Sequence, residues 1–194
     1  MSEERHMLTM RRLTAFSQVE ALYHARLKKD FSRNERRPLA TIRRSWERDA
    51  YDAYVLLDGE EILGYAFLVR LGNNYLFDYL AIAEEHRDEG LGSLFLSRLI
   101  DCLKDADCVV GEVEDPAKAE DADSRAQRER RLQFYLRIGC RETELTANVY
   151  GVDYRILELP REKPFTTNEL REIYTALYRS IFSPRIFRTQ FRIT

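Results

Sequence analysis

The sequence predicts an α/β domain in which a mixed, mostly antiparallel sheet is flanked by helices. Three apolar stretches follow one another and are separated by two turn signals, Asp58-Gly59 and Gly72-Asn73-Asn74, which is typical of an antiparallel meander. A helical stretch then leads from the third strand to a fourth, and a strand–helix–strand unit of this kind normally pairs its strands in parallel. The 194 residues suit one domain with a sizeable core and an added terminal element.

The first 50 residues predict a short strand and two helices. Residues 7–13 have the length of a strand, and apolar side chains recur at helical spacing over residues 16–31. After Pro38, the spacing of Leu39, Ile42 and Trp46 predicts a shorter second helix. Both apolar stripes are interpreted first as faces that pack on the core.

The middle of the chain carries the predicted sheet. Strands are expected at residues 50–57, 61–71, 75–82 and 107–114, with a helix at 90–104 and closing strands at 141–150 and 154–159. The polar segment around Pro116 predicts a loop. Ser124 is the expected N-cap of a helix that runs to about Ile138 and ends at Gly139.

The C-terminal part predicts one further helix. Residues 160–164 carry two prolines and interrupt the strand pattern, and Thr166 and Glu169 then have the spacing of a capping box. A wide apolar face covers residues 170–182, and Pro184 is expected to end the helix. The tail is interpreted as a solvated basic end because it carries Arg185, Arg188 and Arg192.

Composition excludes several classes of protein. The 31 basic and 33 acidic residues nearly balance, which argues against a general nucleic-acid binder. The longest apolar stretch, residues 62–69, is too short to span a bilayer, and no secretion leader opens the chain, so a cytoplasmic location is expected. No metal site is expected, because the few thiols and imidazoles lack metal-ligand spacing: Cys102, Cys108, Cys140, His6, His24 and His86.

The junction between the strand at 75–82 and the following helix predicts an anion site. It reads Arg87-Asp88-Glu89-Gly90-Leu91-Gly92. A helix start exposes unpaired N–H groups at the positive end of the helix dipole, where a phosphate binds readily. Gly90 and Gly92 let a bulky anion approach the backbone, and Arg87 adds a forked positive charge.

This junction resembles the acetyl-CoA-binding motif of the GNAT superfamily of N-acetyltransferases, Arg/Gln-x-x-Gly-x-Gly/Ala after a central strand. A second segment, Phe134-Tyr135-Leu136-Arg137-Ile138-Gly139, resembles the Phe-Tyr-x-x-x-Gly element of the same family. The resemblance covers residues 50–159 well and the first 50 residues only by the order of elements. It implies the GNAT fold, acetyl-CoA as co-substrate, and an acceptor pocket beside the first two helices.

The resemblance also implies which residues hold the donor. Backbone groups of Leu80, Ala81 and Ile82 would bind the pantetheine arm, and the pyrophosphate would lie on Arg87, Asp88, Glu89, Gly90, Leu91, Gly92 and Ser93. Arg128 and Arg131 stand where the common pattern has asparagine and alanine, and either reach a CoA phosphate or form a solvated helix face. The segments around Glu112 and Arg131 resemble a bacterial subgroup whose acceptors are poorly defined.

A standard GNAT domain closes before the last predicted helix. We therefore expect a GNAT domain at residues 1–160 and an appended helix and tail at residues 161–194. The helix either docks on its own domain or pairs with a second subunit, so a homodimer is one possible assembly.

The expected chemistry requires a group that removes a proton from the acceptor. A lysine-like amine with a pKa of about 10.4 is neutral in only about 1 of 2,500 molecules at neutral pH, and binding it deprotonated costs roughly 4.6 kcal/mol. Carboxylates can accept that proton, and the candidates are Asp78, Glu112 and Glu114.

Each candidate allows two interpretations. Asp78 lies in an apolar strand, where burial would raise its pKa and suit it to act as a base, or where it would pair with an arginine. Glu112 and Glu114 alternate onto one face of their strand and form either an anionic acceptor pocket or a solvated surface. The histone-modifying branch of the family has its base glutamate at the position of Leu76, so that role is not transferable.

Tyr135 matches the tyrosine with which many family members protonate the departing thiolate, although it would also fit as a ring packed under the sheet beside Phe134. The sequence therefore predicts an acetyl-CoA-dependent N-acetyltransferase that acts on a small-molecule or peptide amine, without nucleic acid, membrane or metal. A non-catalytic acyl-CoA-binding or protein-interaction module is the alternative, because Leu76 replaces an acid and a helix is added.

Overall fold

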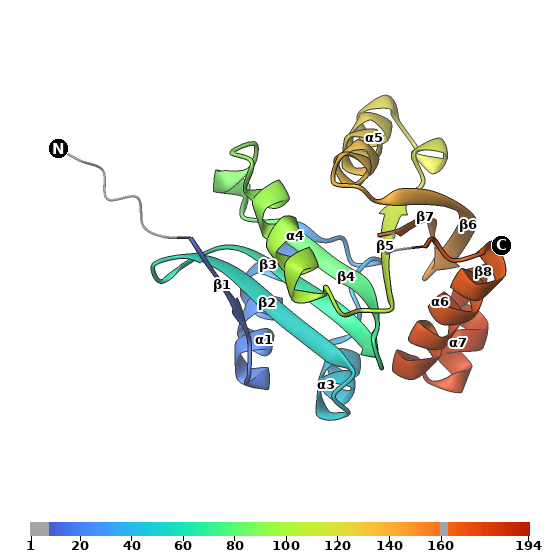
Figure 1. Ribbon diagram of the computed structural model, residues 1–194, viewed down its shortest axis with the longest axis horizontal. Helices are drawn as coiled ribbons and strands as arrows, with labels where there is room; N and C mark the ends of the chain where they lie inside the picture. Colours follow the sequence, from blue (N-terminus) through green and yellow to red (C-terminus); the bar gives the residue numbers. More distant parts are fainter. Residues whose placement is uncertain (1–7, 160–162) are drawn as a thin grey trace.

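An eight-stranded mixed sheet organises the computed structural model, which describes residues 8–159 and 163–194 (Figure 1). The strand order is β1-β2-β3-β4-β5-β7-β6-β8, and every neighbouring pair is antiparallel except β4 and β5. The strands are β1 (Thr9–Arg12), β2 (Tyr51–Asp58), β3 (Glu61–Leu71), β4 (Asn74–Ile82), β5 (Cys108–Glu114), β6 (Arg141–Val149), β7 (Val152–Glu158) and β8 (Phe191–Ile193).

Helices cover both faces of the sheet. The largest hydrophobic core lies under α1, α3 and α6, and a second core lies under α4, with α5 beside it on the same face. The helices are α1 (Phe16–Leu22), the π-helical turn η1 (Tyr23–Leu27), α2 (Lys28–Asp30), α3 (Leu39–Glu47), α4 (Leu91–Cys102), α5 (Ala122–Arg137), α6 (Thr167–Ile181) and α7 (Pro184–Gln190), with 3-10 turns η2 (Glu84–His86) and η3 (Pro116–Lys118).

The predicted fold class is confirmed, with small shifts of the element boundaries. The first strand begins at Thr9, and Met7, which the sequence included, lies outside the described residues. Ser124 is not the N-cap of α5. Asp121 takes that place, because its side chain accepts a hydrogen bond of 2.7 Å from the backbone N–H of Ser124.

The central strands β4 and β5 pair over only three residues. Asn74, Tyr75 and Leu76 lie opposite Cys108, Val109 and Val110, and beyond these pairs the two strands separate (Figure 1). Strand β5 remains paired with β7 as far as Glu114. The edge of β4 that faces β5 is therefore without a strand partner over residues 77–82.

A bulge in β4 changes which side chains face the larger core. Phe67 lies opposite Tyr79 and Leu68 lies opposite Phe77, so Asp78 has no partner on β3. Because the bulge interrupts the alternation of the strand, Asp78 and Tyr79 both point toward the face covered by α1, α3 and α6. Simple alternation would have placed neighbouring residues on opposite faces.

The C-terminal elements pack on the same sheet. Helix α6 contacts β3, β4 and α3, and its capping box at Thr166 and Glu169 forms as predicted. Pro184 begins α7 as well as following α6, and the tail ends in β8, which pairs with β6. The three tail arginines are exposed as expected, but the apolar side chains between them, above all Phe191, join the core. The predicted boundary at residue 160 lies outside the described residues.

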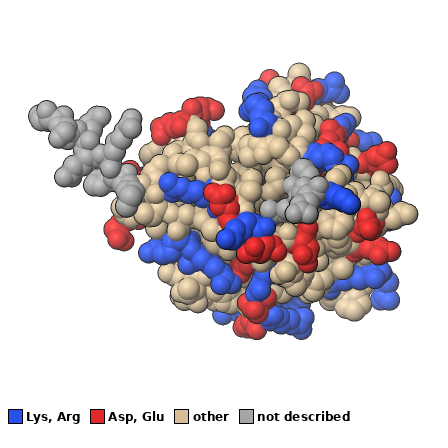
Figure 2. All heavy atoms as spheres, viewed as in Figure 1, with Lys and Arg blue, Asp and Glu red and all other residues tan. Residues whose placement is uncertain are grey.

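The surface carries no strong separation of charge on the face shown in Figure 2. Basic and acidic side chains are interspersed there over both halves of the molecule. Among residues 8–159 and 163–194, no helix combines the length and the apolar character that crossing a membrane requires.

Candidate active site

The junction that the sequence predicts to bind an anion lies at the start of α4. Gly90 is the N-cap with φ 79°, a left-handed conformation that favours glycine, and Asp88 just before it has φ 67°. No described side chain caps this helix start, so the N–H groups of its first turn are open to an incoming anion. The guanidinium of Arg87 is turned toward the carbonyl of Ile82, 3.3 Å away, and toward the carboxylate of Asp30, 3.4 Å away.

The unpaired edge of β4 runs toward this helix start. Leu80, Ala81 and Ile82 pair with β3 on one side only, because β5 has already separated from β4. Backbone N–H and C=O groups on the other side are available to an extended ligand in the manner of an added strand. The residues predicted to bind the pantetheine arm and the pyrophosphate thus extend from the end of β4 to the first turn of α4.

A polar cavity lies beside the point where β4 and β5 separate. It encloses about 530 Å³ of space between protein atoms, including the part that is open to solvent. All three predicted carboxylates line it, together with aromatic and basic side chains from other elements: Phe31, Asn34, Glu35, Arg37, Phe77, Asp78, Tyr79, Glu112, Glu114, Arg131, Val149, Tyr150, Tyr154 and Tyr178. The fold therefore brings together candidates that the sequence placed on two different strands.

Glu112 is held through one of its two oxygens. The hydroxyl groups of Tyr174 and Tyr178 both donate to Oε1, at 2.5 and 2.6 Å. No described residue hydrogen-bonds Oε2. Because Oε2 is not a buried atom without a partner, it is exposed, and it faces the cavity that Glu112 lines. Burial raises the pKa of Glu112, and the two phenol hydrogen bonds offset part of that rise.

Asp78 is paired through both of its oxygens. Arg37 Nε donates to Oδ1 at 2.7 Å, and the hydroxyl of Tyr51 donates to Oδ2. The side chains of Asp78 and Arg37 are only 4% and 5% exposed. Of the two interpretations of Asp78, the structure shows the buried ion pair with an arginine, and each carboxylate oxygen already accepts a hydrogen bond.

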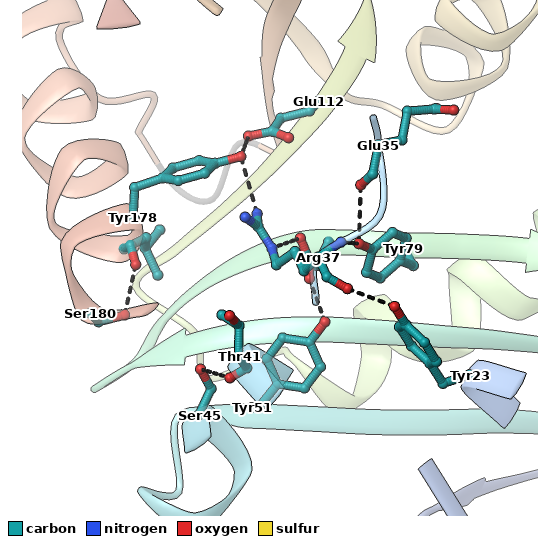
Figure 3. A network of polar contacts seen from close by, with 12 residues as sticks. Tyr23, Glu35, Arg37, Thr41, Ser45, Tyr51, Tyr79, Glu112, Tyr178 and Ser180 are labelled. Atoms are coloured by element: carbon teal, nitrogen blue, oxygen red, sulfur yellow. Dashed lines mark hydrogen bonds and ion pairs between the residues drawn. The ribbon is translucent and has the colours of Figure 1, made fainter. Parts of the chain in front are cut away.

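Arg37 is fixed from several directions, as Figure 3 shows. Its Nη2 donates to the hydroxyl of Tyr178 at 3.2 Å, and its backbone N–H donates to the hydroxyl of Tyr79 at 2.7 Å. Its carbonyl accepts a hydrogen bond from Tyr23, which lies in the π-helical turn. Burial is the largest single effect on Arg37 and disfavours its charge, but the combined attraction of Asp78 and the neighbouring Tyr178, Tyr79 and Glu112 raises the pKa of Arg37 well above the ordinary value.

Glu114 is occupied by the two arginines of α5. Arg128 Nη2 lies 2.9 Å from Oε1, and Arg131 Nη1 lies 3.6 Å from Oε2. Arg128 also donates to the carbonyl of Asp115. These contacts form because α5 crosses the end of β5 closely enough for its basic side chains to reach Glu114.

Tyr135 lies on the opposite face of the sheet from the three carboxylates. It lines a small apolar cavity with Phe77 and Gly111, the first residues beyond the last β4–β5 pair. Its ring packs edge-on against Phe134, and no described residue hydrogen-bonds its hydroxyl. Burial raises the pKa of Tyr135 to about 12, so the phenol stays protonated at neutral pH.

Comparison with known proteins assigns the family. Residues 19–122 match the model of the acetyltransferase (GNAT) family, which is more than half of the chain. The chain belongs to the GNAT acetyltransferase family. No curated protein matches it by sequence.

Solved GNAT structures share the fold of this chain. One from Bacteroides thetaiotaomicron superposes with a TM-score of 0.67 at 19% identity, covering 89% of this chain and 98% of its own. The ribosomal-protein-S18-alanine N-acetyltransferase of Escherichia coli gives 0.59 at 20% identity, with 84% and 98% covered. A GNAT acetyltransferase from Elizabethkingia anophelis gives 0.56 at 16% identity, with 82% and 100% covered.

Several residues of the candidate site were not predicted from the sequence. Arg37 comes from the loop before α3, and Tyr51 comes from β2, so no local pattern links either residue to Asp78. Tyr174 and Tyr178 did carry a signal. They place two hydroxyls four residues apart on the apolar face of α6, and a buried hydroxyl requires a polar partner.

The first prediction concerns the Asp78–Arg37 pair. Asp78→Ala should lower the free energy of unfolding by about 3–5 kcal/mol, because it leaves the buried charge of Arg37 without its partner. The double variant Asp78→Ala with Arg37→Met should lose less than Asp78→Ala alone. Urea unfolding followed by circular dichroism measures these differences.

An exposed ion pair provides the control for this prediction. Glu20 and Arg43 are paired at 2.9 Å on the surface, and Glu20→Ala should cost less than about 1 kcal/mol. If Asp78→Ala costs no more than Glu20→Ala, the Asp78–Arg37 pair does not stabilise the site.

Proposed function

We propose that the protein transfers the acetyl group of acetyl-CoA directly to a primary amine of a small molecule or a peptide. One observation carries this proposal: the uncapped start of α4 and the free edge of β4 lie on one side of the β4–β5 opening, and a cavity lined by carboxylates lies beside it. An anionic, extended donor and a cationic acceptor would meet where the two strands separate.

The residues of the chain fit acetyl-CoA as the donor. The N–H groups after Gly90 suit a pyrophosphate, and the free edge of residues 80–82 suits the amide groups of a pantetheine arm. Bound acetyl-CoA supplies an acyl group on a thiolate leaving group. The structure from Elizabethkingia anophelis was solved with acetyl-CoA bound, and a Bacillus subtilis acetyltransferase of similar fold was solved with CoA.

The charge of the cavity supports a cationic amine as the acceptor. Four acidic side chains line it against two basic ones: Glu35, Asp78, Glu112 and Glu114 against Arg37 and Arg131. Two solved neighbours are named for amine acceptors, a ribosomal-protein alanine and spermidine. An ammonium group therefore gains from this cavity before it is deprotonated.

Glu112 is the carboxylate best placed to accept the amine proton. Arg37 and Tyr51 donate to the two oxygens of Asp78. Arg128 and Arg131 form ion pairs with the two oxygens of Glu114. Oε2 of Glu112, in contrast, faces the cavity without a described partner. Its raised pKa brings it closer to the pH at which a general base works best.

Tyr135 is the proposed donor of the proton that the departing thiolate needs. Its phenol lies beside Phe77 and Gly111, where β4 and β5 begin to separate, and its raised pKa keeps the proton on the oxygen. As the amine nitrogen bonds to the carbonyl carbon and the carbon–sulfur bond breaks, Glu112 takes the amine proton and Tyr135 donates to the departing sulfur.

The proposed function is tested by donor binding and thiol release. Isothermal titration should detect heat for CoA and acetyl-CoA, and a thiol-release assay over a broad panel of amines should find at least one acceptor. Gly90→Val should abolish the heat, because its left-handed φ of 79° is strained for valine.

A second left-handed glycine serves as the matched control. Gly59 has φ 57° in the β2–β3 turn, so Gly59→Val carries a similar strain but should retain the heat of CoA binding. Absence of heat with the wild-type chain would overturn the proposal. Heat without release on any amine would favour a non-catalytic acyl-CoA-binding module.

A further prediction concerns Glu112. With an amine from the panel, Glu112→Gln should lower kcat/KM by about 100-fold or more at neutral pH, the usual size of a general-base contribution, while CoA affinity stays the same. Glu114→Gln should have a smaller effect, because its carboxylate is already bound to Arg128 and Arg131. A larger loss in the Glu114 variant would transfer the role to that residue.

Tyr135 is tested separately. Tyr135→Phe removes only the hydroxyl, so turnover should fall about 10-fold or more without weaker CoA binding. Unchanged turnover would refute the role of Tyr135 as the proton donor.

A further inference from the structure

Helix α6 reaches the catalytic cavity although it lies outside residues 19–122, the part of the chain that matches the family model. Tyr174 and Tyr178 are both almost completely buried, and their hydroxyls converge on one oxygen of Glu112. The rings of the two tyrosines pack on each other and on Phe191 of β8, which limits their movement. The C-terminal elements thus hold two hydrogen-bond donors against Glu112 of β5.

The direction of each hydrogen bond is determined by chemistry. Arg37 has only N–H donors, so Tyr178 can only accept from its Nη2 and must direct its own proton elsewhere. Its proton goes to Oε1 of Glu112, which lies 2.6 Å away. Tyr174 directs its proton to the same oxygen at 2.5 Å. Two donors occupy the lone pairs of Oε1, and the carboxylate is left with one accepting oxygen, Oε2.

We propose that Tyr174 and Tyr178 are positioning residues that saturate Oε1 of Glu112 and leave Oε2 as the only oxygen available to the acceptor amine. This inference rests on the proposed function, in which Glu112 accepts the amine proton. It makes α6 a part of the active site and not only a support for the sheet.

The effect of the two tyrosines on the pKa of Glu112 depends on the other groups around this carboxylate. Charged and titratable groups approach it from every packed element: Arg37 from the loop before α3, Asp78 from β4, Glu114 from its own strand, Tyr154 from β7, Arg131 from α5, and the two tyrosines. Burial raises the pKa of Glu112, whereas the hydrogen bonds from Tyr174 and Tyr178 lower it. Loss of either hydroxyl should therefore raise the pKa of Glu112 further.

The experiment measures that pKa directly and needs no acceptor. Protein labelled with carbon-13 at the glutamate carboxyl groups is titrated by NMR, and the signal of Glu112 is assigned by its absence in Glu112→Gln. Tyr174→Phe and Tyr178→Phe should each raise the pKa of Glu112 by about one unit or more, a ten-fold change in its acid dissociation constant. An unchanged pKa in the folded variants would overturn the proposal.

Tyr65 provides a matched control. Its hydroxyl also donates to a carboxylate, that of Asp30, at 2.9 Å, but it does not touch Glu112. Tyr65→Phe should leave the pKa of Glu112 unchanged. An equal shift in this variant would show that loss of any buried phenol perturbs Glu112, and would overturn the specific role of the α6 tyrosines.

Two further measurements distinguish a failure of this inference from a failure of the proposed function or of the variants to fold. With an amine that is turned over, the acid limb of the kcat/KM profile should move to higher pH by the same amount in both variants, which a purely structural role would not cause. If no amine is turned over, the proposed function fails, but the NMR titration still tests whether Tyr174 and Tyr178 hydrogen-bond Glu112. If neither variant folds, a crystal structure of the wild-type chain decides it. Both hydroxyls within about 3 Å of one oxygen support the inference, and separate oxygens overturn it.

Discussion

The short pairing between β4 and β5 is the constraint on which the rest of the structure depends. Parallel strands that stayed together would satisfy each other's backbone groups and leave no room between them. Here the pairing stops after three residues, and β5 continues on β7 while β4 continues on β3. The result is a free edge on β4, an opening through the sheet, and a meeting point for groups from both faces.

The three carboxylates of the cavity differ in the groups that compensate their charge. Asp78 neutralises a fully buried arginine, and Glu114 binds the two arginines of α5. Both therefore hold elements in place: Asp78 ties the loop before α3 to β4, and Glu114 ties α5 to β5. The hydrogen-bond donors to Glu112 are neutral phenols and not cations, and no described residue hydrogen-bonds its Oε2. The proposed role of Glu112 depends on this difference, because a carboxylate paired with arginine is a weaker base.

The C-terminal elements explain how this GNAT protein supports a site without an acid at Leu76. Leu76 is fully buried in the short β4–β5 pairing, where an ionised group would lack a partner. In the proposed function the base is Glu112 of β5, on the other side of the opening, and α6 supplies two hydrogen bonds to it. The same helix and β8 complete the larger core, so stability and site geometry depend on one packed cluster of aromatic side chains.

Sequence alone determined the order of the elements, the mixed sheet and the glycine-bearing junction before α4, because those features depend on local rules. Turn residues, apolar periodicity and the glycines at positions 90 and 92 act over a few neighbouring residues, and their patterns are visible in the chain. Only the tertiary structure decided which carboxylate is free. Arg37 is 41 residues from Asp78, and Tyr178 is 66 residues from Glu112, so these pairings arise when distant segments pack together. The bulge at Asp78 and the three-residue limit of the β4–β5 pairing also depend on neighbouring strands, which no local pattern encodes.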